Sequence, residues 1–89
     1  EEARAARLDY DEIHRALGDD FVARLEHALE MIRERPEAWP AAARGTRRYI
    51  MQRFPYAVVY RVRGDSLLVV AVSHLRRRPE YWKGRVRRP

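Results

Sequence analysis

The stretch RRYIMQRFPYAVVYRVRGDSLLVVAVSH, residues 47–74, determines the fold that the sequence predicts. It is rich in β-branched and aromatic residues, which favour strands. Pro55 interrupts it, because proline cannot donate a ladder hydrogen bond, and Gly64–Asp65 is typical of a tight hairpin turn. The stretch therefore predicts three antiparallel strands, over 47–54, 56–63 and 66–74.

The two-residue turn sets the register that we expect for the hairpin. If Arg63 faces Ser66, the expected pairs are Arg61–Leu68, Val59–Val70 and Ala57–Val72. One face should then pack on helices and carries Tyr56, Val58, Tyr60, Val62, Leu67, Val69 and Ala71. The opposite face has an apolar floor with basic residues near its rim, and it is expected to be a shallow concave surface. It carries Ala57, Val59, Arg61, Leu68, Val70, Val72 and His74.

Apolar residues at helical spacing predict two helices before the sheet. The first stripe is Ala6, Tyr10, Ile13 and Leu17, and the second is Phe21, Leu25, Ala28, Leu29 and Ile32. Gly18 breaks the pattern between them, and Pro36 ends the second helix. The prediction is one α+β domain over residues 1–89: a helical hairpin at 1–35, an antiparallel sheet at 46–74 and a basic tail at 75–89.

Composition excludes several classes of protein. The chain has 89 residues, enough for one domain, and contains no cysteine, which excludes disulfides and cysteine-bound zinc. It has no metal-ligand spacing, phosphate loop or nucleophile triad, so no metal and no cofactor are expected. No apolar run approaches the roughly 20 residues of a membrane span, and no signal peptide is visible. A cytoplasmic protein without membrane contact is the expectation.

Charge is distributed unevenly along the chain, whose net charge is +6. Residues 1–37 hold 11 acidic and 6 basic residues, whereas residues 38–89 hold 13 basic residues and only two acids, Asp65 and Glu80. Lys83 is the only lysine, but a preference for arginine does not explain why the acids avoid the second half. The asymmetry predicts a basic face that attracts a polyanion or an acidic protein segment.

Three local patterns follow one another at a characteristic spacing: PEAWP at 36–40, RRY at 47–49 with RFPYAVVYR at 53–61, and VAVSHLRRRP at 70–79 with Tyr81–Trp82. Together they resemble the RelE/ParE superfamily of toxins from bacterial type II toxin–antitoxin systems, also described as plasmid-stabilisation proteins. Members usually begin with one more strand before the helices, and nothing here matches it. Either the sequence starts after that strand or the protein lacks it. In the second case one sheet edge would be open or covered by a partner.

The resemblance implies a toxin that inhibits growth and is neutralised by a cognate antitoxin, with which it forms a hetero-oligomer. ParE-like members poison DNA gyrase and carry no recognised nuclease site, whereas RelE-like members cut mRNA on the ribosome without a metal. RelE-like enzymes carry basic residues on the concave face of the first strand of this sheet. Tyr49 and Met51 are expected there, and Ala57 falls at a further basic position. The ParE-like branch and a non-enzymatic toxin are therefore favoured.

A ribosome-dependent endoribonuclease and a non-toxic nucleic-acid-binding module remain alternatives. DNA gyrase or ribosome-bound mRNA is the expected target. Residues expected to bind the target or the antitoxin are Arg53, Arg61, His74, Arg76, Arg77, Arg78, Tyr81, Trp82 and Arg85. If the protein is a nuclease, the catalytic candidates are Arg61, His74, Arg76 and Tyr81. Each also has a structural interpretation: His74 as a strand cap, Trp82 as a hydrophobic clamp, and the arginines as a solvated surface.

Overall fold

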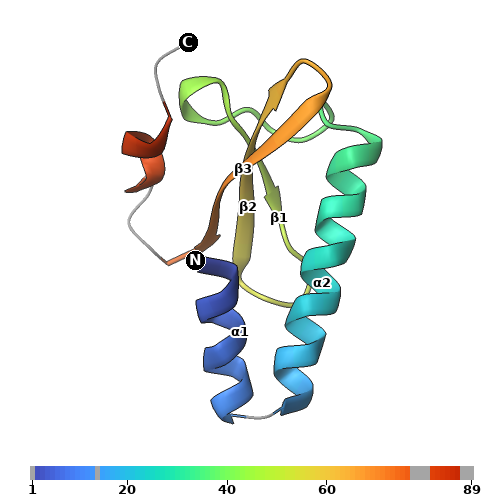
Figure 1. Ribbon diagram of the computed structural model, residues 1–89, viewed down its shortest axis with the longest axis vertical. Coiled ribbons are helices and arrows are strands. Elements are labelled where there is room, and N and C mark those ends of the chain that lie inside the picture. Colours follow the sequence, from blue (N-terminus) through green and yellow to red (C-terminus); the bar gives the residue numbers. More distant parts are fainter. Residues whose placement is uncertain (1, 14, 77–80, 87–89) are drawn as a thin grey trace.

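The structure, a computed structural model, describes residues 2–13, 15–76 and 81–86. Two helices precede a three-stranded antiparallel sheet of order β1-β2-β3 (Figure 1), so the predicted α+β class is confirmed. One short 3₁₀ helix precedes the strands in the sequence, and another follows them. The elements in chain order are α1 (Glu2–Ile13), α2 (Arg15–Glu34), η1 (Ala43–Gly45), β1 (Arg47–Ile50), β2 (Tyr56–Arg63), β3 (Ser66–His74) and η2 (Tyr81–Arg85).

The two helices form the predicted antiparallel pair, but the break between them is not at Gly18 (Figure 1). Helix α2 already begins at Arg15 and runs through Gly18, which is buried. Glycine in a helix interior costs about 1 kcal/mol relative to alanine, which packing along a 20-residue helix readily offsets. The predicted break at Gly18 is therefore wrong.

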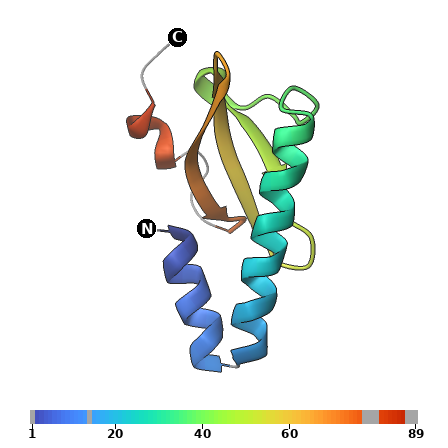
Figure 2. The same ribbon diagram turned by 45° about the vertical axis from the view of Figure 1, so that its right-hand side comes forward.

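The main core lies between α2 and one face of the sheet, which we call the inner face. Figure 2 shows α2 on this side of the sheet and η2 on the opposite side. The Phe21 ring of α2 is fully buried and contacts the rings of Phe54 and Tyr56 edge-on, at centroid distances of 5.3 and 5.1 Å. Such edge-to-face contacts add to the energy of apolar burial. The helical hairpin is thus attached to the sheet mainly through α2.

Strand β1 is shorter than the predicted 47–54, because it ends at Ile50. The chain then loops, and Arg53 takes a left-handed conformation with φ 70°. This turn directs Phe54 into the core, where only 5% of it is exposed. Burial of Phe54 therefore outweighs the strand preference of the preceding residues.

The β2–β3 hairpin has the predicted turn at Gly64–Asp65 but a different register beyond it. The pair Arg61–Leu68 is confirmed. A bulge then inserts one extra residue, Val70, into β3, so the predicted pairs Val59–Val70 and Ala57–Val72 are wrong. The observed pairs are Val59–Ala71, Val58–Val72 and Ala57–Ser73. Because a one-residue shift reverses the faces, Val72 joins the inner core and Ala71 the opposite face.

The connector between α2 and β1 is fastened to the inner core. The Trp39 ring packs edge-on against Tyr49 at 4.7 Å, and the Tyr60 hydroxyl donates a 2.5 Å hydrogen bond to the Pro36 carbonyl. Burial of Tyr60 raises its pKa, and nearby Arg47 opposes that effect. The Trp39 ring thus anchors the connector to the inner core.

Candidate functional site

The sheet face that points away from α1 and α2, which we call the outer face, brings cationic and apolar side chains together. Arg48 lies opposite Val59, and Val59 lies opposite Ala71, so these three residues share this face across all three strands. Val59 and Ala71 are almost completely buried, whereas Arg48 is exposed. The outer face therefore has an apolar floor with a cation beside it.

A cavity of about 350 Å³ opens on the outer face, and we call it the outer-face cavity. Its polar side chains are a guanidinium, a hydroxyl and an imidazole, and its apolar wall includes an indole ring. Such a lining can hold an anionic or hydrogen-bonding group against an apolar surface. The cavity is lined by Pro40, Ala41, Ala42, Arg48, Ala57, Val59, Ser73, His74, Leu75 and Trp82.

The sequence analysis missed Arg48 as a site residue. It placed Tyr49 and Met51 on this face, but both side chains are buried in the inner core, at 6% and 4% exposure. The run Tyr49–Ile50–Met51 is apolar throughout, so the sequence offers no alternation that separates its two faces. The expected lack of a cation on the first strand is therefore wrong.

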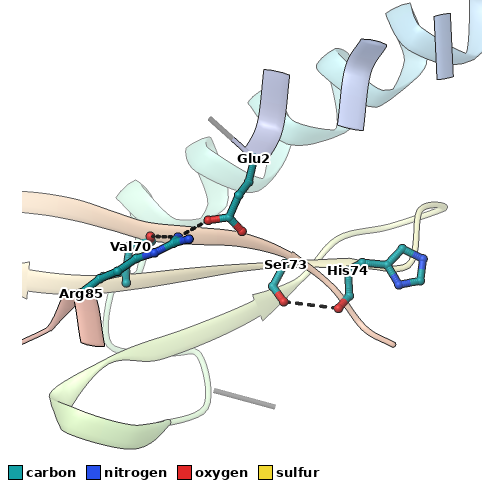
Figure 3. Close-up of polar contacts among 5 residues, drawn as sticks. All are labelled: Glu2, Val70, Ser73, His74 and Arg85. Carbon is teal, nitrogen blue, oxygen red and sulfur yellow. Dashed lines mark hydrogen bonds and ion pairs between the residues drawn. The ribbon is translucent and has the colours of Figure 1, made fainter. Parts of the chain in front are cut away.

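His74 ends β3 and adjoins the outer-face cavity. Its ring contacts the Tyr56 ring edge-on at 5.0 Å, and its Nδ1 accepts a 3.0 Å hydrogen bond from the backbone N–H of Arg76. Figure 3 shows its side chain projecting from the end of the strand. Because Nδ1 is occupied as an acceptor, any proton transfer by this ring would use Nε2.

The helix η2 covers part of the outer face, which is therefore less open than the sequence predicts. Trp82 and Val86 are each 4% exposed and pack with Val59 and Ala71 in a second, smaller core. Arg85 holds η2 in place, since its guanidinium pairs with the Glu2 carboxylate and donates a 3.2 Å hydrogen bond to the Val70 carbonyl (Figure 3). The Trp82 side chain thus serves as a hydrophobic clamp in this structure.

The predicted binding residues are only partly brought together. Arg61 is half-buried on the outer face opposite Leu68, and Arg76 is exposed just beyond β3. Arg53 does not reach this face, because its guanidinium pairs with Asp20 of α2 at 2.6 Å. Arg53 therefore does not lie with Arg61 on the outer face.

The remaining predicted residues belong to the C-terminal part of the chain. Arg77 and Arg78 lie outside the described residues. Tyr81 begins η2, but its side chain lies outside the described part of the structure. Among the described cations, Arg61 and the unpredicted Arg48 thus share the outer face, and Arg76 lies just beyond the end of β3.

Within the described part of the chain, no three histidine or carboxylate side chains are grouped so that they could hold a metal ion. Neither described helix combines the length and hydropathy that crossing a membrane requires.

One family model matches the chain, over residues 3–79, and its description is ParE toxin of type II toxin-antitoxin system, parDE. The match begins in α1 and includes the whole sheet. No curated protein and no solved structure matches the chain significantly.

Proposed function

The chain belongs to the ParE toxin family of type II toxin–antitoxin systems, and from this premise we propose that it inhibits bacterial growth until its cognate antitoxin neutralises it. The family match over residues 3–79 is the observation that carries the proposal. DNA gyrase is the proposed target, in keeping with the ParE-like branch that the sequence resembles.

The outer face is the proposed contact surface for the antitoxin. Arg48 and Arg61 supply positive charge there, and the exposed side chains of Ile50 and Leu68 extend the apolar floor to the surface. An acidic amphipathic segment complements such a surface, because its carboxylates meet guanidinium groups and its apolar side chains meet the floor. Arg48 is at the centre of this proposal, since it lines the outer-face cavity and is exposed.

Expression of the chain in bacteria tests the proposed activity. Growth should slow, and co-expression of the small protein encoded by the adjacent reading frame should restore it. Normal growth at high soluble expression would contradict the proposal. Tight, salt-dependent nucleic-acid binding without any effect on growth would instead indicate a plain binding module.

Charge reversal at Arg48 tests the proposed surface. Arg48→Glu should weaken binding of that adjacent-frame protein at least about tenfold, because it places like charges in contact. Arg33→Glu, which makes the same charge change on the exposed side of α2, is the matched control and should bind within about twofold of the parent. Equal weakening by the two variants would mean that binding depends on the net charge of the protein and not on the position of Arg48.

A ribonuclease of the RelE-like kind is the second candidate, and Arg48 is the observation that favours it. Arg48 and His74 line one cavity, and the backbone of Arg76 positions the His74 ring. In such a reaction a ribose 2′-hydroxyl attacks the adjacent phosphate to form a cyclic phosphate, and the P–O5′ bond breaks. The guanidinium would stabilise the phosphorane charge, and His74 Nε2 would take the 2′ proton and deliver it to the departing 5′ oxygen.

Cleavage assays separate the two candidates. Cutting of ribosome-bound message that is lost in Arg48→Ala and in His74→Ala would favour the ribonuclease. Intact message together with inhibited supercoiling by purified gyrase would favour the gyrase poison.

A further inference from the structure

The turn that follows β3 is held by two hydrogen bonds whose acceptors differ in kind. The N–H of Leu75 donates to the Pro55 carbonyl at 2.8 Å, and a backbone carbonyl does not titrate. The N–H of Arg76 instead donates to Nδ1 of the His74 ring at 3.0 Å. The second bond therefore depends on the protonation state of a side chain, whereas the first does not.

The bond to Arg76 requires a neutral imidazole. A neutral ring accepts a hydrogen bond at the nitrogen that carries no proton, whereas both nitrogens of a charged ring are donors. Protonation of His74 thus leaves two donors, Nδ1 and the Arg76 N–H, 3.0 Å apart. Turning the ring over does not restore the bond, because a C–H group then takes the place of Nδ1. An imidazole typically changes its charge between about pH 5 and 8, so this bond is lost within that range.

The charged and titratable groups around the His74 ring come from three parts of the chain. On β2, the Tyr56 ring lies edge-on to it at 5.0 Å. On β1, the exposed Arg48 guanidinium lines the same outer-face cavity, and the uncharged indole of Trp82 lines it from η2. Arg76 follows two residues later and is exposed. Among the described residues that line the cavity, Arg48 is thus the only charged side chain as long as His74 is neutral.

We propose that His74 is a pH-sensitive switch for this turn: the neutral ring fixes the backbone at Arg76, and the charged ring releases it. Leu75, between these two residues, is 46% exposed and forms part of the wall of the outer-face cavity. Protonation therefore loosens that wall and adds a second positive charge to the lining, so the cavity attracts anionic groups more strongly at mildly acidic pH. The inference rests on the hydrogen bond and does not require the proposed function.

Exchange of backbone amide protons with water, measured by NMR on the full chain between about pH 5 and 8, tests the proposal. Each rate is divided by the intrinsic rate at that pH, which gives a protection factor. Protection of the Arg76 amide should fall about threefold to tenfold from the neutral to the acidic end, because one hydrogen bond is lost. The Leu75 amide is the internal control and should stay within about twofold, since its acceptor does not titrate.

Two substitutions separate the acceptor from the proton. An asparagine side chain accepts a hydrogen bond from the N–H two residues later and does not titrate, so His74→Asn should keep the protection of Arg76 over the whole pH range. Phenylalanine keeps a ring beside Tyr56 but offers no acceptor, so His74→Phe should lack that protection throughout. The amide spectrum of β2 confirms that both variants are folded.

The switch is overturned by constant protection of the Arg76 amide in the parent, or by the same pH dependence in His74→Asn. A parallel fall at Leu75 would overturn it as well, because it would mean that the whole turn loosens in acid. Growth inhibition does not enter these measurements, so their failure leaves the proposed function intact, and the expression test decides that function separately.

Discussion

The inner and outer faces of the sheet are packed by very different means. The inner face is covered by a 20-residue helix whose Phe21 and Ile32 are almost completely buried. The outer face is covered mainly by a five-residue 3₁₀ helix that contributes Trp82. The difference indicates that the inner face provides the stability of the fold, whereas the outer face keeps part of its apolar floor and its cations accessible to a partner.

Phe21→Ala should show the largest effect, because it empties the centre of the inner core. Replacing a fully buried phenylalanine typically costs about 3–5 kcal/mol, a large part of the stability of a small domain. Urea unfolding followed by circular dichroism measures the loss. Leu8→Ala, at an exposed position, should stay within about 0.5 kcal/mol of the parent. A loss below 1 kcal/mol for Phe21→Ala would contradict the conclusion that the inner face provides the stability of the fold.

Trp82→Ala should destabilise the protein less, by about 2 kcal/mol, although tryptophan is the larger side chain. The reason is that η2 packs mainly on the outer face, with one ion pair to α1, and can detach while the helices and strands stay folded. The same urea titration measures this loss. A loss as large as that of Phe21→Ala would mean that the two cores unfold as one unit.

Tyr60→Phe should cost about 1 kcal/mol at neutral pH, since it removes the hydrogen bond to Pro36. Burial raises the pKa of Tyr60, so the folded state favours the neutral phenol. This contribution is complete below the ordinary tyrosine pKa of about 10 and is lost as the pH rises through the higher folded value. Unfolding measured from pH 8 to 11 should show the decline in the parent and less of it in Tyr60→Phe.

Arg53→Ala should have the smallest effect, below about 1 kcal/mol, because its ion pair with Asp20 is about half exposed on both sides. Binding of the adjacent-frame protein should not change, since the Arg53 guanidinium pairs with Asp20 of α2 and does not lie on the outer face. A tenfold loss of binding, measured by calorimetry, would place Arg53 in the interface after all.

Periodicity in the sequence was enough to predict the order of elements. The apolar stripes predicted the helical pair, and Gly64–Asp65 predicted the hairpin turn, because both are local signals. The bulge at Val70 carries no local signal: no glycine marks it, and it shifts every later residue of β3 to the other face. The predicted position of Val72 on the outer face therefore failed with the register.

Predictions about the site were limited in the same way, because most of its contacts leave no local signal in the sequence. The face of Arg48 could not be assigned from its own segment, because Tyr49, Ile50 and Met51 are all apolar and show no alternation. The ion pair of Arg53 with Asp20 could not be predicted from the sequence either, because it joins two segments that only the fold brings together. Arg85 likewise contacts Glu2 from a position 83 residues away.

That last contact has a consequence for how the protein is made. Helical pairs and hairpins form from neighbouring residues and close quickly, whereas a contact that spans almost the whole chain bears the largest loop-closure cost and forms late. Synthesis proceeds from the N-terminus, so Val59 and Ala71 leave the ribosome before the residues of η2 that will cover them. Until η2 has been synthesised and has packed, the nascent chain exposes Val59 and Ala71 to any protein that can bind them.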